Sequence, residues 1–230
     1  MIVKIKRCSD PDSTPYWQSF SYDGPEHVTV SALLDALNYS DDLYDVDGNL
    51  APKIRWECSC MQAVCGGCAM VINGSPALAC NTFVDEVRGR ELVLEPLSKF
   101  PVVADLIVDR QIIYDNLISA KAYLDSIAES DQRQHRQQYS VAKCLKCGLC
   151  LEVCPNYHPG GEFFGAVFAN ESYLIASQSA EKKPPVVKEY KTHFGSNCSK
   201  ALSCQNICPA GIETITSIMS SPLIPFEEYE

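Results

Sequence analysis

Cysteine is the residue type that this sequence places where chemistry could occur. Thirteen of its 230 residues are cysteines, and all but Cys8 fall in three runs with short, regular intervals. Thiolates are preferred ligands of iron–sulfur clusters and of zinc. The cysteine runs therefore indicate metal binding, and their intervals distinguish the kinds of site.

The first run has the spacing C-x4-C-x2-C followed by a distant fourth cysteine. Its members are Cys60, Cys65, Cys68 and Cys80. This is the spacing of plant-type 2Fe–2S loops, and Gly66 and Gly67 permit the close approach of the backbone that such a loop needs. A four-cysteine zinc site is the alternative, but it usually pairs two C-x2-C units. We therefore expect a 2Fe–2S cluster.

Two cysteines stand outside this set. Cys58 lies two residues before Cys60 and could compete with it as a ligand, but Cys60 keeps the four-residue interval. We therefore expect Cys58 to be a buried neighbour of the cluster. Cys8 lies in a strand-like stretch, and we expect it to be a small core residue because free cysteine is often buried.

The second and third runs, "CLKCGLCLEVCP" and "CSKALSCQNICP", align with each other residue by residue. The former is the C-x2-C-x2-C-x3-C-P run of two-cluster ferredoxins, in which the fourth cysteine ligates the other cluster. This rule divides the cysteines into two sets. One cubane takes Cys144, Cys147, Cys150 and Cys208, and the other takes Cys154, Cys198 and Cys204.

Ala201 stands where the alignment would place the counterpart of Cys147. A methyl group cannot bind iron, so a cubane with three thiolates predicts a 3Fe–4S cluster. The alternative is a 4Fe–4S cluster whose fourth ligand is Ser199, Ser203 or water. Oxygen is a poorer ligand than sulfur for soft iron sites, which favours the 3Fe–4S interpretation.

Composition narrows the class of protein. The chain is 46% hydrophobic and 21% charged, as globular proteins are, and its formal net charge of −10 argues against nucleic-acid binding. No apolar run approaches the roughly 18 residues of a membrane-spanning helix. The start of the sequence reads as a strand and lacks the apolar core of a signal peptide, so metal binding is favoured over disulfides.

The sequence predicts an α+β chain of two domains. Residues 1–103 form a 2Fe–2S ferredoxin-like domain of the β-grasp type, with strands over 1–7, 17–23 and 90–97, a helix over 29–39 and a hairpin turning at Asn73-Gly74. Residues 104–230 form an α-helical, bacterial-ferredoxin-like domain with two cubane-type clusters. We expect a helix over 102–127, a polar bridge over 129–140 that is a solvated linker or a helix end, a helix over 162–177, a Lys/Pro loop over 179–191 and a helix over 211–221.

This combination resembles the iron–sulfur subunit of the succinate dehydrogenase/fumarate reductase family over nearly the whole chain. The resemblance rests on "CMQAVCGGCAMVINGSPALAC", on "VVADLIVDRQIIYDNL" as the family's interdomain helix, on "CLKCGLCLEVCPN" and on the C-x5-C-x3-C-P spacing of the last run. It implies that single electrons pass between a partner's flavin and a membrane quinone through 2Fe–2S, 4Fe–4S and 3Fe–4S clusters. It also implies that this chain holds no dicarboxylate site.

The resemblance further implies the partner subunits of this chain and its place in the cell. An FAD-containing flavoprotein would carry the catalytic site, and one or more membrane anchor subunits, with or without a cytochrome b and its haem, would hold the complex at the membrane. The quinone would be menaquinone or ubiquinone. The chain itself would lie peripherally on the cytoplasmic side of the inner or plasma membrane.

The sequence departs from the family at the quinone end. Many members have tryptophan just after the first Cys-Pro and lysine after the second, whereas this chain has "CPNYHPGG" and Ala210. Tyr157 and His158 are candidates for the quinone-proximal groups, as hydrogen-bonding or proton-donating side chains. The alternative is a surface turn at this segment. Three rival functions remain open: a subunit of another flavoprotein with a non-quinone acceptor, a free ferredoxin-like carrier, and a structural metal protein.

Overall fold

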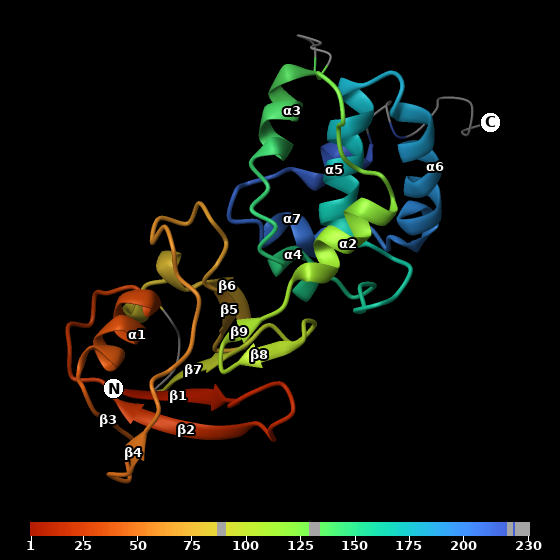
Figure 1. Ribbon diagram of the computed structural model, residues 1–230. Helices are drawn as coiled ribbons and strands as arrows, with labels where there is room; N and C mark the ends of the chain where they lie inside the picture. Colours follow the sequence, from red (N-terminus) through yellow and green to blue (C-terminus); the bar gives the residue numbers. More distant parts are fainter. Residues whose placement is uncertain (87–90, 129–133, 220–222, 224–230) are drawn as a thin grey trace. The chain divides into compact units, whose positions relative to one another are not determined.

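The computed structural model describes residues 1–86, 91–128, 134–219 and 223 (Figure 1). The chain divides into two compact units, Met1–Asp109 and Arg110–Glu230. The expected boundary after residue 103 lies within strand β8 (Val102–Ala104). Because β8 pairs with β9 (Ile107–Val108), the residues up to Asp109 belong to the first unit.

The first unit is built on a five-stranded mixed sheet with strand order β2-β1-β7-β5-β6. Strands β1 and β7 are parallel, and the other neighbours are antiparallel. This is the expected β-grasp arrangement. Its elements are β1 (Ile2–Arg7), β2 (Tyr16–Ser21), α1 (Val30–Tyr39), β3 (Leu43–Tyr44), β4 (Leu50–Ala51), β5 (Ala69–Ile72), β6 (Ser75–Leu78), the short 3-10 helices η1 (Ala79–Asn81) and η2 (Val84–Glu86), and β7 (Glu91–Glu95).

Local sequence explains these elements. Buried and partly exposed residues alternate along β1, as a strand with one face on the core requires. Asn73 and Gly74 have φ angles of 46° and 79°, so the predicted two-residue hairpin turn is confirmed. The Thr29 hydroxyl accepts a hydrogen bond from the Ala32 N–H at 3.2 Å and caps the start of α1.

The helix expected over 102–127 is wrong in its first part. Residues 102–108 form the β8–β9 hairpin, and only α2 (Gln111–Ser119) is helical. Asp105 turns the chain with a φ of 45°, and its carboxylate accepts hydrogen bonds from the backbone N–H groups of Cys8 and Arg55. These long-range bonds override the local helical spacing.

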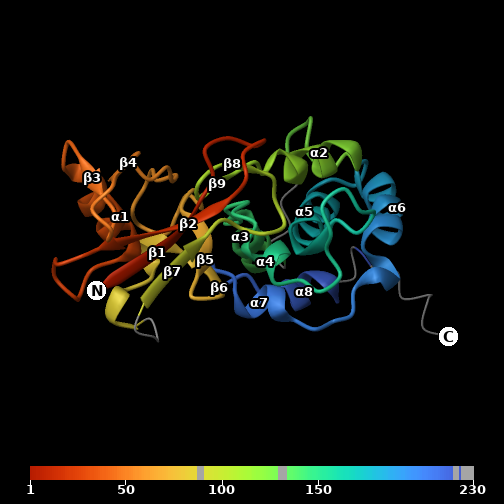
Figure 2. The ribbon, with the colours of Figure 1, turned by 90° about the horizontal axis from the view of Figure 1, so that it is seen from below.

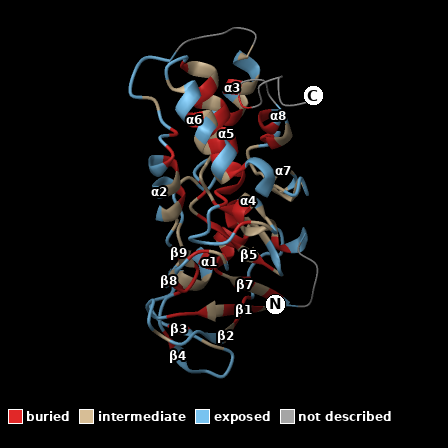
Figure 3. Ribbon diagram, turned by 90° about the vertical axis from the view of Figure 1, so that its right-hand side faces the viewer, coloured by how far each residue is buried: buried red, intermediate tan, exposed pale blue. Residues whose placement is uncertain are grey.

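The second unit is helical and centred on α5 (Gly165–Gln178). Around it lie α2, α3 (His135–Ala142), α4 (Leu149–Glu152), α6 (Lys183–His193) and α8 (Thr214–Ile218), each of which contacts α5 (Figure 2). The short η3 (Gly195–Asn197) and α7 (Ser203–Asn206) complete the unit. Most of α5 is buried, and it is the red helix at the middle of this unit in Figure 3.

The expected helix over 162–177 is confirmed as α5, and α8 lies within the helix expected over 211–221, whose residues 220 and 221 are outside the described residues. Two other expectations are corrected. The polar bridge is not a solvated linker over its described part, because it contains most of α3, and Gln138 of this helix is buried. Its residues 129–133 lie outside the described residues. The segment expected to be a Lys/Pro loop is the helix α6. Proline is tolerated in the first turn of a helix, because the N–H groups that it lacks would have no partner within the helix there. No helix in the described ranges is long and apolar enough to span a membrane.

Candidate iron–sulfur sites

The β5–β6 hairpin brings two of the predicted 2Fe–2S ligands together. Cys68 immediately precedes β5, and Cys80 lies in η1 immediately after β6. Their Sγ atoms are 3.3 Å apart, and the Cys80 N–H points at the Cys68 sulfur. Burial, together with the neighbouring Cys80, raises the pKa of Cys68 to about 12.

The irregular loop before β5 holds the other two predicted ligands, Cys60 and Cys65. The N–H groups of Gln62 and Val64 lie 3.3 and 3.4 Å from the Cys60 sulfur. These two bonds, with a third from Cys65, lower the pKa of Cys60 to about 7. The loop therefore favours the thiolate form that a metal requires.

Left-handed residues shape this loop. Met61, Ala63 and Gly66 have φ angles of 55°, 57° and 78°. Alternating left-handed conformations turn successive N–H groups toward one side, where they form an anion-binding concavity. The Ala63 N–H accordingly points at the Cys80 sulfur at 3.3 Å, which joins the loop to the hairpin.

The four thiols thus form two pairs, Cys60 with Cys65 and Cys68 with Cys80. A 2Fe–2S cluster has two irons, and four cysteines supply two thiolates to each. The pairing and the surrounding N–H donors fit this cluster. Within the described ranges, no three His, Cys, Asp or Glu side chains form a group that could hold a single metal ion.

The two cysteines outside the ligand set differ from each other. Cys58 is exposed, so the expectation that it is a buried neighbour is wrong. It lies in the irregular loop between β4 and β5. Cys8 is 4% exposed, and its thiol donates a hydrogen bond to the Asp10 carbonyl at 3.1 Å, as expected for a core residue.

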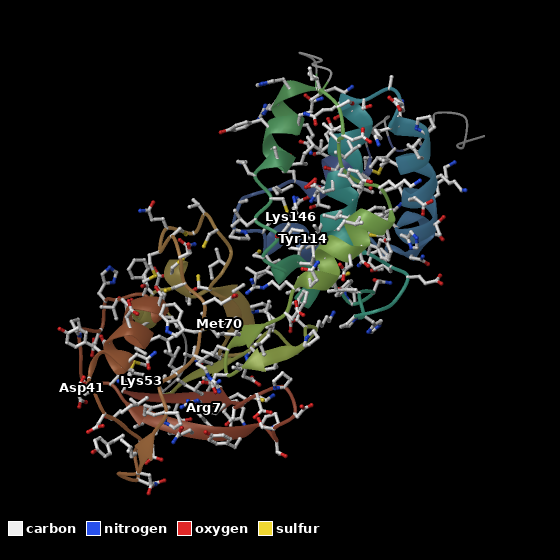
Figure 4. The ribbon with its side chains drawn as sticks, viewed as in Figure 1. Arg7, Asp41, Lys53, Met70, Tyr114 and Lys146 are labelled. Carbon is white, nitrogen blue, oxygen red and sulfur yellow. The ribbon has the colours of Figure 1, made fainter. Side chains whose placement is uncertain are left out.

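A buried ion pair anchors the segment that leads into the cysteine loop. Arg7 and Asp105 are each 1% exposed, and Arg7 Nε lies 3.1 Å from Asp105 Oδ1 (Arg7 is labelled in Figure 4). The Arg7 guanidinium also donates to the carbonyls of Pro52 and Lys53. Because the Asp105 carboxylate holds the Arg55 N–H at 2.9 Å, this network fixes the chain shortly before Cys60.

In the helical unit, the two aligned cysteine runs have the same backbone. Lys146 and Gly148 flank Cys147 with φ angles of 52° and 88°, and Lys200 and Leu202 flank Ala201 with 57° each. Helices α4 and α7 follow at corresponding positions, each begun by the left-handed residue. The N–H of Lys146 points at Cys144 as that of Lys200 points at Cys198. The sequence repeat is therefore a structural repeat.

The structure brings the four predicted 4Fe–4S ligands together. Cys144, Cys147, Cys150 and Cys208 line one cavity, and Cys204 of the second set also lines it. Burial raises the pKa of Cys147 to about 11 and that of Cys150 well above its usual range. An apolar cavity with converging thiols fits a cluster that binds thiolates and neutralises their charge.

The second set comprises Cys154, Cys198 and Cys204. Burial and then the thiols of Cys154 and Cys198 raise the pKa of Cys204 to about 11. Ala201 is exposed and has no side chain that could serve as a ligand. The Ser199 hydroxyl donates to the Asn156 amide oxygen at 2.7 Å, so this candidate fourth ligand is engaged elsewhere.

The candidate quinone-proximal residues lie after the first Cys-Pro. Tyr157 is 1% exposed, and burial raises its pKa, with a smaller contribution from Cys150. His158 is exposed, and its carbonyl accepts the Gly161 N–H in a turn. The adjacent residues thus lie in different environments, Tyr157 in the interior and His158 at the surface.

Sequence reasoning missed polar residues around the 4Fe–4S cavity. Asn170 and Thr214 line it, and Lys146 forms an ion pair with Glu171 of α5 (Lys146 is labelled in Figure 4). Burial lowers the pKa of Lys146, but Glu171 and Cys144 together raise it above the usual value. The signal for Asn170 and Glu171 was present in "GAVFANESYLIAS", where they interrupt an otherwise apolar stretch.

The sheet, the helical unit and the three thiol groups define an iron–sulfur protein of the ferredoxin type, with a β-grasp unit followed by a helical two-cluster unit. Comparison with protein families agrees. Residues 2–115 match the 2Fe-2S iron-sulfur cluster binding domain, and residues 140–212 match the 4Fe-4S dicluster domain. The predicted fold class is thereby confirmed.

Individual relatives specify the family. The succinate dehydrogenase iron-sulfur subunit of Bacillus subtilis is 31% identical, over 93% of this chain and 88% of its own length. The fumarate reductase iron-sulfur subunit of Escherichia coli is 31% identical, over 94% and 89%. A chain of the Mycobacterium smegmatis Sdh1 complex in the apo form shares the fold, with a TM-score of 0.71 and 20% identity over 93% of this chain and 89% of that one.

This chain belongs to the family of succinate dehydrogenase and fumarate reductase iron–sulfur subunits. Its role is therefore electron transfer as part of an oxidoreductase complex, and its cofactors are iron–sulfur clusters of the 2Fe–2S and cubane types. The resemblance seen in the cysteine runs is confirmed.

Proposed function

We propose that this chain transfers single electrons between the flavin of an FAD-containing partner subunit and a membrane quinone. The observation that carries this proposal is the presence of three separate thiol groups on one chain, of which one lacks a fourth cysteine. Bound 2Fe–2S, 4Fe–4S and 3Fe–4S clusters each supply a one-electron carrier, which couples a two-electron flavin to stepwise quinone chemistry.

The chain's own residues hold and shield these carriers. Cys60, Cys65, Cys68 and Cys80 would hold the 2Fe–2S cluster; Cys144, Cys147, Cys150 and Cys208 the 4Fe–4S cluster; and Cys154, Cys198 and Cys204 the 3Fe–4S cluster. Backbone N–H groups of the cysteine loop would donate to sulfur. The apolar wall of the second cavity would exclude water, since hydrogen bonding and solvent exposure both set cluster potentials.

Partner subunits follow from the kind of protein that the relatives are. A subunit of succinate dehydrogenase or fumarate reductase needs a flavoprotein to handle the dicarboxylate, and this chain would leave that chemistry to it. Quinone linkage needs a membrane anchor, with or without a cytochrome b and haem, that would hold the chain at the membrane periphery. The direction of electron flow depends on these partners and on the quinone, menaquinone or ubiquinone.

Exchanging single ligands tests the crossed assignment of the two cubanes. Because Cys208 follows the third run but is assigned to the 4Fe–4S cluster, Cys208→Ser should abolish or strongly alter the reduced 4Fe–4S signal. Cys154→Ser should instead alter the oxidised 3Fe–4S signal. Low-temperature EPR of both variants in the assembled complex measures this. The reverse pattern would contradict the assignment.

His158→Ala tests the quinone end. If the exposed imidazole donates a hydrogen bond or a proton to quinone, this variant should slow quinone turnover about 10²-fold or more while reduction of the clusters by the flavoprotein keeps its rate. Steady-state quinone assays and stopped-flow cluster reduction separate the two steps. Unchanged quinone kinetics would remove His158 from the site. A wild-type complex without quinone turnover would instead favour the non-quinone acceptor that Ala210 and the missing tryptophan also allow.

A further inference from the structure

The cavity that gathers Cys144, Cys147, Cys150 and Cys208 has one buried amide in its wall. Asn170 lies on α5, is 5% exposed and lines this cavity together with Thr214 of α8. Its Nδ2 donates a hydrogen bond to the Thr214 Oγ1 at 3.1 Å. Thr214 is 2% exposed, so water does not compete for this contact.

The amide oxygen of Asn170 has no hydrogen-bond partner among the described residues, although it is fully buried. Leaving such an acceptor unsatisfied is unfavourable, because the oxygen gives up its hydrogen bonds to water on burial and gains none in return. Its surroundings make the arrangement worse, because the cavity is lined by sulfur atoms that become electron-rich acceptors when they bind iron. An acceptor oriented toward these sulfur atoms would gain nothing from the cavity.

A 180° rotation of the amide about the Cβ–Cγ bond exchanges Oδ1 and Nδ2. It removes both the unpartnered oxygen and the unfavourable contact between acceptors. The group keeps its shape, the Thr214 hydroxyl donates to Oδ1, and the NH₂ group takes the place of the oxygen that lacked a partner. The buried oxygen then has a partner, and the NH₂ group is available to donate to a cluster sulfur. A hydroxyl can donate as well as accept, so the bond between Asn170 and Thr214 is kept with its direction reversed.

We propose that Asn170 is a positioning residue that donates a hydrogen bond from its side-chain amide to the sulfur of the 4Fe–4S site and raises the reduction potential of that centre. The inference rests on the proposed function, because it requires a 4Fe–4S cluster in this cavity. Reduction adds negative charge, and a donor stabilises the more negative state more strongly. Thr214 holds the amide in the donating orientation.

Three variants of the assembled complex test this proposal. Asn170→Leu removes the amide at similar volume, and Asn170→Asp keeps the shape but replaces the donor by an acceptor. The control is Ser172→Ala on the same helix. It removes a buried hydroxyl that, like the Asn170 oxygen, has no partner among the described residues, but Ser172 does not line the cavity. The readouts are an EPR-monitored redox titration of the 4Fe–4S signal and pulsed EPR of the reduced centre after exchange into D₂O.

Asn170→Leu should lower the reduction equilibrium constant of the 4Fe–4S centre about tenfold, which is about 59 mV for one electron. Asn170→Asp should lower it at least as far, and Ser172→Ala should leave it unchanged. One exchangeable deuterium coupling should disappear in Asn170→Leu. If this variant does not assemble, Thr214→Val keeps the amide but frees its orientation, and should give a smaller fall of the same sign.

Different results would contradict the role of Asn170 and the proposed function of the chain. An unchanged potential and unchanged deuterium couplings in Asn170→Leu, or an unchanged potential in Thr214→Val, would overturn the role of Asn170 while the 4Fe–4S signal persists. A wild-type complex with no reducible 4Fe–4S signal would instead overturn the proposed function on which this role depends.

Discussion

Replacing Asp105 with asparagine should lower the free energy of unfolding of the N-terminal unit by about 3 kcal/mol or more, and loosen the 2Fe–2S loop with it. The substitution keeps the side-chain shape and tolerates the left-handed φ of 45° at this position. It removes the charge and replaces one acceptor oxygen by an NH₂ donor. The Arg7 guanidinium would then be buried without its counter-charge, which is the costly state for an ion pair in an apolar interior.

The substitution should also affect the 2Fe–2S site, because the Asp105 side chain holds the segment that leads into the cysteine loop. Its carboxylate accepts hydrogen bonds from the N–H groups of Cys8 at 3.0 Å and Arg55 at 2.9 Å, besides the contacts with Arg7. Arg55 begins the stretch that runs into the cysteine loop. An amide presents one acceptor and one donor in place of two acceptors, so one of these N–H groups would lose its partner.

The measurement is guanidinium denaturation of the full chain, followed by the visible circular dichroism of the 2Fe–2S centre. Lys6→Ala is the matched control, since the Lys6–Glu95 pair at 3.3 Å is 39% and 31% exposed at its two side chains and should contribute only about 0–1 kcal/mol. If Asp105→Asn cost no more than Lys6→Ala, the buried network would have no special role in the loop.

Replacing Ala201 with cysteine should convert the 3Fe–4S centre into a 4Fe–4S centre almost completely. The backbone already has the conformation of the first run, with left-handed residues on both sides of Ala201 as on both sides of Cys147. A cysteine there would present its thiol in the way that Cys147 does. The oxidised-state 3Fe–4S EPR signal should disappear, and a centre with a lower potential should take its place.

Ala201→Ser is the matched control, because a hydroxyl of nearly the same size is a poor ligand for soft iron. It should keep the 3Fe–4S signal. A cysteine variant that retained the wild-type signal, despite its matching backbone, would show that position 201 does not face the open corner of the cluster.

The ligand groups could be read from the sequence because cluster geometry imposes short intervals on the chain. The intervals around Cys60 and around Cys147 reflect loops that must wrap a compact cluster, and the structure brings these thiols together. The hairpin at Asn73-Gly74 was equally accessible, because its conformation depends on two adjacent residues.

The features that sequence reasoning missed depend on residues far apart. The helical spacing after Val102 gives way to a hairpin because Asp105 pairs with Arg7, at the other end of the unit's sequence. Cys58 is exposed. The exposure of a loop residue depends on which distant segments pack against the loop, and the intervals between cysteines do not indicate this. The role of Asn170 depends on Thr214 and on the cavity that both line.

The most direct test of the central claim is low-temperature EPR of the wild-type complex, first air-oxidised and then reduced with dithionite. The account predicts a 3Fe–4S signal in the oxidised state, and signals of a 2Fe–2S and a 4Fe–4S centre after reduction. Three reducible clusters without an oxidised-state 3Fe–4S signal would contradict it. They would mean that a ligand other than cysteine completes the cubane at Ala201.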